Sequence, residues 1–179
     1  MFEAQKCLTE ELHEKFEKYN NIKMLNNAVS NTNGDIVLLY KETEGSTLAS
    51  QYKRNLDFYN IDLNQSERAQ TVRLDSFIEK ESLSHIDLFK IDIEGNELKA
   101  LEGMGNYLNA DFVDFIQFEY GGCNLDSHTS LMEIYALLTS KGFKIARITK
   151  KGLCFYDYNP NMDNFMYCNY VAVSKKILL

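Results

Sequence analysis

The sequence predicts an α/β fold in which helices alternate with the strands of a mostly parallel sheet. Short apolar segments take turns along the chain with segments whose apolar residues recur at helical spacing. One apolar segment, residues 86–93, lacks the strict apolar–polar alternation of a half-exposed strand. We therefore expect this segment to be a central parallel strand that is covered on both faces.

The size and charge of the chain limit its class. A chain of 179 residues suits one domain with a sizeable core, and we expect a single domain over residues 1–179. The net charge of −7 disfavours nucleic acid and anionic membranes as partners. The four cysteines stand far apart, without the C-x-x-C spacing of zinc sites, and they indicate free thiols in a reducing, cytoplasmic compartment.

The first part of the chain contains four predicted elements. Apolar residues at helical spacing predict an amphipathic helix over residues 4–19. A strand over residues 22–30 and a second strand over residues 36–40 flank the turn at Asn33-Gly34. Residues 41–70 are polar and irregular, and they predict a long surface excursion.

The rest of the chain continues the alternation. Asp75 is expected to be the N-cap of a short helix, and Ser130 with Glu133 forms a capping-box pattern before a helix that stops near Gly142. Residues 150–165 are expected to form a long aromatic loop. The predicted strands are 71–74, 86–93, 113–119, 143–149 and 167–174, and the predicted helices are 75–81, 94–108 and 129–141.

Acidic side chains gather where the predicted parallel strands end. Asp92 and Glu94 lie at the carboxyl end of one strand, two residues apart and therefore on the same side. Glu119 lies at the matching end of the next strand, and His128 precedes the helix after it. Because α/β sheets bind ligands beyond the carboxyl ends of their strands, these side chains predict one pocket rim. A carboxylate such as Asp92 is costly to desolvate at a strand tip unless it binds something.

Structural roles for these residues remain open at this point. Glu94 alternatively complements the positive end of the following helix. Lys90 is expected to neutralise one of the acids or to extend into solvent, and His128 alternatively is an ordinary loop residue. Oxygen ligands on separate loops are a weak pattern for a divalent cation, so no metal site is predicted.

Two further positions could hold a nucleotide. Glu3 precedes the first helix, and an acid at the end of a strand binds ribose hydroxyls in nucleotide-binding α/β folds. The alternative is an ordinary acid at a helix start. Asn27 and Ala28 lie late in a predicted strand, where they could approach an adenine edge. The sequence contains no glycine-rich phosphate loop and no nucleophile elbow.

Several segments together resemble the FkbM family of S-adenosylmethionine-dependent methyltransferases. The strongest likeness is V-R-L-D-S-F at 72–77 followed by I-D-L-F-K-I-D-I-E-G-N-E-L-K-A-L-E-G at 86–103. Phe2-Glu3 resembles the family's F-E-P segment, and the stretch 27–34 resembles its strand and turn. The likeness covers about residues 2–149.

This resemblance implies a Rossmann-like, seven-stranded methyltransferase sheet and the cofactor S-adenosyl-L-methionine. It also implies methylation of an oxygen on a sugar or another small metabolite. Glu3 would hold the cofactor ribose, and Asn27 and Ala28 would lie beside the adenine. Asp92 would face the sulfonium and the acceptor hydroxyl, with Glu94 and Glu119 as further catalytic candidates and His128 as a substrate-binding candidate.

The resemblance begins partway through the family pattern. The expected first strand, first helix and most of the second strand have no counterpart before Phe2, so we expect an incomplete domain with weak cofactor affinity. The strand over residues 86–93 would then have an exposed edge, through which the chain could form a homodimer. A non-catalytic interaction module or an inactive fragment is the alternative. A glycosyltransferase is a further option, although Asp92-Ile-Glu94 only approximates its D-x-D motif.

Overall fold

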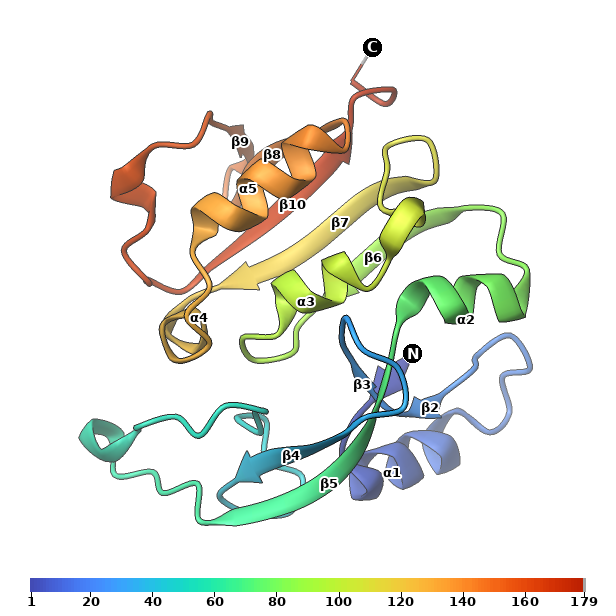
Figure 1. Cartoon of the computed structure of the whole chain (residues 1–179), viewed down its shortest axis with the longest axis vertical. Helices are drawn as coiled ribbons and strands as arrows, with labels where there is room; N and C mark the ends of the chain where they lie inside the picture. Colours follow the sequence, from blue (N-terminus) through green and yellow to red (C-terminus); the bar gives the residue numbers. More distant parts are fainter. Residues whose placement is uncertain (179) are drawn as a thin grey trace.

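The computed structural model describes residues 1–178 and shows a mixed α/β fold. Its strands form three sheets of five, three and two strands, arranged in two halves (Figure 1). A seven-stranded sheet is therefore not present as one continuous sheet in the described residues. Among them, no helix is long and apolar enough to cross a membrane.

The larger half is built on the five-stranded sheet. Its order is β6-β7-β10-β8-β9, in which β6 and β7 are parallel and the other neighbours are antiparallel. Helices α3 and α5 lie against one face (Figure 1). The bounds are β6 Ile86–Ile91, α3 Glu97–Glu102, β7 Val113–Tyr120, α4 Gly122–Asp126, α5 Leu131–Ser140, β8 Phe143–Thr149, β9 Gly152–Phe155 and β10 Cys168–Ser174.

The smaller half contains the two other sheets. β1 pairs in parallel with β2, while β5 pairs in parallel with β3 and antiparallel with β4. Helix α1 lies at the outer side of this half, and α2 follows β5 (Figure 1). The bounds are β1 Phe2–Glu3, α1 Lys6–Phe16, β2 Leu25–Asn26, β3 Ala28–Val29, β4 Ile36–Lys41, β5 Gln65–Val72 and α2 Leu74–Glu81.

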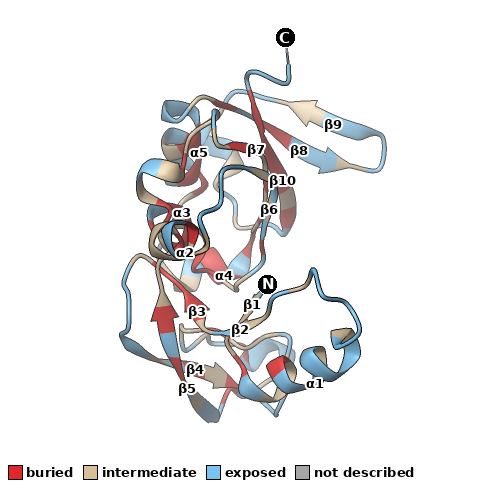
Figure 2. Ribbon diagram, turned by 90° about the vertical axis from the view of Figure 1, so that its right-hand side faces the viewer, coloured by how far each residue is buried: buried red, intermediate tan, exposed pale blue. Residues whose placement is uncertain are grey.

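The main core lies between the five-stranded sheet and its helices. Figure 2 shows most of the buried residues in this half, whereas α1 is largely exposed. Helix α5 packs its apolar side against the sheet. It begins at the predicted capping box: the Glu133 N–H donates to Ser130 Oγ, and the Ser130 N–H donates to Glu133 Oε2 at 2.8 Å. The fully buried apolar residues include Leu101, Met104, Ile116, Phe118, Leu131, Ile134, Leu138 and Phe143.

Several predicted elements differ from the structure. The expected helix over residues 94–108 is an α-helix only over Glu97–Glu102, and the strand over residues 22–30 is divided into β2 and β3. The expected strand over residues 71–74 is only the end of β5, which begins at Gln65 within the predicted excursion. The loop over residues 150–165 contains β9. Asp75 is not an N-cap; Arg73 holds that position, and its guanidinium is paired with the Asp75 carboxylate.

The prediction that the strand over residues 86–93 is covered on both faces is wrong. β6 has β7 as its only strand neighbour in the part of the chain that the structure describes. Leu88 is 58% exposed, and Lys90 also faces solvent. The apolar run therefore reflects an edge strand with one open face rather than a central strand.

Candidate active site

A cavity of about 460 Å³ lies where the two halves of the fold meet. Its walls come from β1, β3 and β4 on one side and from the carboxyl ends of β6 and β7 on the other. Most of the predicted site residues line this one cavity, namely Glu3, Asn27, Ala28, Asp92, Glu94 and Glu119.

A strained turn after β6 sets the direction of its two acids. Glu94 has a φ of +50°, and Gly95 follows at +103°, a conformation that side chains rarely adopt. A Cβ on Gly95 would lie 2.8 Å from the carbonyl oxygen of Cys123. The buried Glu97 carboxylate accepts hydrogen bonds from the N–H groups of Ile93 and Gly95, each at 3.2 Å. These contacts fix the turn before any ligand binds.

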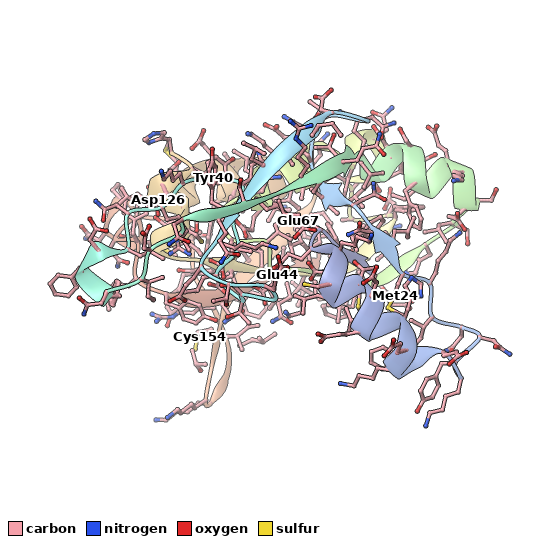
Figure 3. All side chains as sticks on the ribbon, turned by 90° about the horizontal axis from the view of Figure 1, so that it is seen from below. Met24, Tyr40, Glu44, Glu67, Asp126 and Cys154 are labelled. Atoms are coloured by element: carbon pink, nitrogen blue, oxygen red, sulfur yellow. The ribbon has the colours of Figure 1, made fainter. Side chains whose placement is uncertain are left out.

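Glu94 is held by an arginine from the 41–70 excursion. Arg54 Nη1 lies 2.8 Å from Glu94 Oε2, and its Nε lies 3.2 Å from Asp126 Oδ2. Figure 3 shows Asp126 beside this excursion, far from α1. The pKa of Glu94 is raised to about 7, chiefly by burial; Arg54 lowers it in part, and the neighbouring carboxylates add to the rise. The Glu94 side chain can therefore gain or lose a proton near neutral pH.

Asp92 and Glu119 form the other acidic wall. Lys90 Nζ lies 2.7 Å from Asp92 Oδ2, as expected for a lysine that neutralises a neighbouring acid. Burial raises the pKa of Glu119, while a hydrogen bond from Tyr167 opposes that shift. Because Asp92 is about half exposed, it remains accessible to a ligand.

Glu3 stands at the opposite wall, directly after β1. Its Oε1 accepts a hydrogen bond from the Gln5 N–H at 2.7 Å, which is the role of an ordinary acid at a helix start. Its Oε2 forms no hydrogen bond within the described chain, so it can accept one from a ligand. Asn27 Nδ2 donates to the Gln70 carbonyl at 3.2 Å, which leaves the Asn27 carbonyl oxygen free within the same described residues.

The predicted surface excursion also contributes to the cavity. Residues 46–49 and Gln51 line it. Ser50 Oγ donates to the Glu94 carbonyl at 2.7 Å, and Tyr52 donates to Asn96 Oδ1 at 3.1 Å. Sequence reasoning missed this wall because residues 46–54 have no helical or strand periodicity, and they are held by these tertiary hydrogen bonds.

The cavity is strongly acidic. Glu3, Asp92, Glu94 and Glu119 all line it, and no lysine or arginine does so among the residues that the structure describes. A phosphate or another anion would meet only like charge on these walls, whereas a cation would meet opposite charge. The arrangement therefore suits a neutral or positively charged ligand.

His128 is placed differently from the prediction. It is exposed after α4, with a φ of +57°, and it is absent from the described residues that line the cavity. A group of side chains with metal-ligand chemistry, His85 with Asp87 and Asp114, lies at the amino-terminal ends of β6 and β7, away from the carboxyl ends that line the cavity. The acids of the cavity and His128 therefore do not form one site.

The fold and the position of the cavity indicate a class of protein. An α/β protein that binds its ligand beyond the carboxyl ends of parallel strands, with an acid after an early strand, fits the nucleotide-cofactor class. The model of the methyltransferase FkbM domain matches residues 2–145, and the chain belongs to this family of methyltransferases. No curated protein matches the chain significantly, and no solved structure does so either.

Proposed function

We propose that this chain carries the site of an S-adenosylmethionine-dependent methyltransferase that acts on an oxygen of a sugar or small metabolite. The observation that carries this proposal is the acidic cavity without a lining cation. S-adenosylmethionine bears a sulfonium, an ammonium and one carboxylate, a net charge of about +1 without any phosphate, so these walls favour it over phosphorylated nucleotides. The volume of about 460 Å³ lies in the range of cofactor pockets.

Three residues would hold the cofactor. Glu3 Oε2 has room to accept a hydrogen bond from a ribose hydroxyl, since Oε1 is already occupied by the Gln5 N–H. Asn27 offers a carbonyl oxygen to an amino group of the adenine, and Ala28 leaves space for a flat ring beside β3. The placement of these residues in the cavity and the family of the chain support these proposed roles.

The acids at the other wall would act on the acceptor. The cofactor supplies an already activated methyl group, so much of the rate enhancement can come from positioning. Asp92 is placed to accept the hydrogen bond of the acceptor hydroxyl and to take its proton. Glu94, whose pKa is raised to about 7, can hold that proton near neutral pH, and burial raises the pKa of Glu119 as well.

The charge argument can be tested by comparing two adenine-containing ligands. Titration of the ¹⁵N-labelled chain with S-adenosylmethionine should shift the amide signals of Asn27, Ala28 and residues 46–49. ATP should leave these signals in place because its phosphates are repelled by the acidic walls. Equal binding of both ligands, or binding of ATP alone, would contradict the proposed function.

A second candidate function is association through the edge of β6. The Ile86 N–H donates to the Phe112 carbonyl, so the alternating pattern leaves the backbone groups of Asp87, Phe89 and Ile91 toward the open edge. An apolar hollow of about 370 Å³ lies beside this edge and includes Leu88. We propose that a second copy of the chain pairs along β6 and forms a homodimer.

Sedimentation velocity over a range of protein concentrations tests this pairing. Leu88→Lys should yield a monomer because the charge falls on the contact surface. Leu125→Lys is the matched control, since Leu125 is 56% exposed on α4 and Leu88 is 58% exposed on β6. A wild-type chain that stays monomeric, or a dimer that survives Leu88→Lys, would rule out this interface.

A further inference from the structure

Three side chains with metal-ligand chemistry lie together at the end of the five-stranded sheet that is opposite to the cavity. They are His85, Asp87 and Asp114, and we call them the His85 group. Each offers one ligand atom, an imidazole nitrogen or a carboxylate oxygen, and these atoms all lie within 4.8 Å of one another. None of the three residues lines the cavity. The proposed function therefore gives the His85 group no role.

The pairing of β6 with β7 brings the two aspartates together. The strands are parallel, and Ile86 is the register partner of Val113. Asp87 and Asp114 are the residues directly after these two, so they occupy neighbouring positions on adjacent strands. His85 directly precedes β6, and its Nε2 lies 3.1 Å from Asp114 Oδ2. The His85 group thus combines two strand-borne carboxylates with one imidazole.

The charge of the two aspartates is poorly balanced by the protein. Carboxylates at neighbouring strand positions repel each other. In the described part of the chain, Asp114 has only the His85 imidazole within ion-pair distance, and Asp87 has no basic partner. By contrast, Asp92 at the other end of β6 is paired with Lys90 at 2.7 Å. A cation bound between Asp87 and Asp114 would replace this repulsion by attraction.

We propose that the His85 group binds a Zn²⁺ ion, and that this ion ties the edge strand β6 to β7. An imidazole nitrogen with carboxylate oxygens is a donor set that suits Zn²⁺, whereas Mg²⁺ and Ca²⁺ prefer oxygen ligands alone. Zinc bonds to these atoms are about 2.0–2.2 Å long, so the three side chains would close inward around the ion. The side chains of His85 and Asp114 are 40% and 31% exposed, which leaves a water access to a fourth position.

Such an ion would stabilise the strand that leads to the acids of the cavity. β6 has β7 as its only strand neighbour in the described residues. Asp87 belongs to β6 and Asp114 to β7, so an ion bound by both holds the two strands together at their amino-terminal ends. A ligand that binds only the folded chain raises its free energy of unfolding. The ion is therefore expected to act on stability and to take no part in methyl transfer.

The test titrates the ¹⁵N-labelled chain with ZnCl₂ and, separately, with MgCl₂. We expect Zn²⁺ to shift the amide signals of residues 85–87 and 113–115 and the ring nitrogen signals of His85, and to saturate with one ion per chain. MgCl₂ at the same concentrations should leave these signals in place, because an imidazole nitrogen is a poor ligand for Mg²⁺. Absence of zinc shifts at these residues, or equal shifts with MgCl₂, would overturn the proposal.

The cysteines need a control of their own because Zn²⁺ also binds thiolates. Cys7 and Cys154 are partly exposed. CoCl₂ is the probe, since a thiolate bound to Co²⁺ gives a charge-transfer absorption band that imidazole and carboxylate ligands do not give. We expect the Co²⁺ spectrum to lack this band. A charge-transfer band of equal strength in the wild type and in His85→Ala would assign the metal to the thiols and contradict the proposal.

Two pairs of matched variants assign binding to the His85 group. His85→Ala should weaken zinc binding more than about 100-fold, because even residues that only support a metal ligand are worth about 10–100-fold. His13→Ala removes an exposed histidine on α1 and should bind like the wild type. Asp87→Asn should also lose binding, and Asp62→Asn, at an exposed position outside the group, should keep it. Wild-type affinity in His85→Ala or Asp87→Asn would overturn the proposal.

Urea denaturation tests the structural role of the ion. Saturating ZnCl₂ should raise the urea midpoint of the wild type and leave that of His85→Ala unchanged. The same gain in both chains would show that the ion does not act through the His85 group. This proposal goes beyond the proposed function and does not depend on it, because S-adenosylmethionine reports on the cavity through Asn27 and Ala28. Zinc binding in a chain that binds no cofactor would support the metal site and contradict the proposed function.

Discussion

At the scale of single residues, Glu94 combines a left-handed backbone, an ion pair and a titration near neutral pH. Its φ of +50° directs the carboxylate toward the cavity and toward Arg54 at 2.8 Å. Burial raises its pKa to about 7, against the effect of Arg54. A carboxyl group of this kind is present in both protonated and ionised forms at neutral pH, whereas an exposed glutamate is almost fully ionised.

Removal of Arg54 should raise the pKa of Glu94 further. Arg54→Met deletes the cation that favours the ionised form, while burial and the neighbouring acids remain. Carboxyl ¹³C NMR titration measures the change directly. Arg68→Met removes an exposed arginine on β5 and serves as the control, which should leave the titration of Glu94 unchanged. An unchanged pKa in Arg54→Met would contradict the electrostatic account.

The free energy of unfolding should fall as the pH rises from about 5 to about 7. Glu94 binds its proton more tightly in the folded chain, with a pKa of about 7 against the usual 4.5. Its contribution is fully present below pH 4.5 and is lost as the pH rises through about 7. This pKa difference can contribute at most about 3 kcal/mol to the free energy of unfolding. Urea titrations should therefore show a smaller fall in the free energy of unfolding for Glu94→Gln than for the wild type. An identical pH dependence in both chains would refute this assignment.

Gly95→Ala should destabilise the fold more than Gly152→Ala. Both glycines have φ values that disfavour a side chain, +103° and +116°. A Cβ at Gly95 would also meet the Cys123 carbonyl at 2.8 Å, whereas a Cβ at Gly152 meets nothing within 4 Å. We expect about 1–3 kcal/mol from backbone strain at Gly152 and a larger loss at Gly95. Urea denaturation measures the free energy of unfolding of both variants. Equal losses would show that the contact with the Cys123 carbonyl adds nothing to the backbone strain.

At the scale of elements, the segment over residues 46–54 closes one side of the cavity and is held by a single bridge to Tyr40 and by separate side-chain contacts. Ser50 and Tyr52 each donate one hydrogen bond to the turn after β6, and Arg54 adds its two ion pairs. Segments held by isolated hydrogen bonds open more easily than packed strands. The wall of the cavity is therefore expected to open without unfolding of the sheet.

Ser50→Ala should speed hydrogen exchange in residues 46–54 and leave exchange in β7 unchanged. The variant loses the 2.7 Å hydrogen bond to the Glu94 carbonyl, worth about 0.5–1.5 kcal/mol. Ser66→Ala, at an exposed position of β5, is the control. Hydrogen exchange is measured by mass spectrometry. Protection of residues 46–54 in Ser50→Ala equal to that in the wild type would contradict the account.

The elements also show which parts of the fold can be predicted from sequence. β4, β7, β8 and α5 were predicted because their apolar patterns and the capping box at Ser130 are local signals. β5 was missed in part because its sequence, Q-S-E-R-A-Q-T-V, is mostly polar and its strand is held by pairing with β4 and β3. β6 was placed correctly and its open edge was expected from the resemblance, but its exposed face was not predicted, since sheet order is a property of the whole chain.

In the candidate site, too, local patterns could be predicted from sequence and contacts between distant segments could not. Asp92, Glu94 and Glu119 could be grouped from sequence because ends of parallel strands meet at one edge. The position of His128 could not be predicted from the strand ends, because it depends on α4, a five-residue helix without a periodic pattern. Arg54 was missed because it lies in an aperiodic segment, and its ion pairs with Glu94 and Asp126 form only in the folded chain.

At the scale of the whole molecule, the two halves provide complementary walls. The smaller half offers Glu3 and Asn27, and the larger half offers Asp92, Glu94 and Glu119. The cavity exists only where both halves meet. On the proposed function, the cofactor would bind at this junction, with the candidate catalytic acids on the wall that the larger half provides.

Binding of S-adenosylmethionine to wild type, Glu3→Gln and Glu11→Gln tests the central claim most directly. We expect saturable, weak binding to the wild type, with amide shifts at Asn27, Ala28 and residues 46–49. Glu3→Gln should weaken it about tenfold, because one charge-assisted hydrogen bond to the ribose is lost. Glu11→Gln removes an exposed acid on α1 and should bind like the wild type. The account would be contradicted by the absence of shifts in the wild type or by equal affinity in Glu3→Gln.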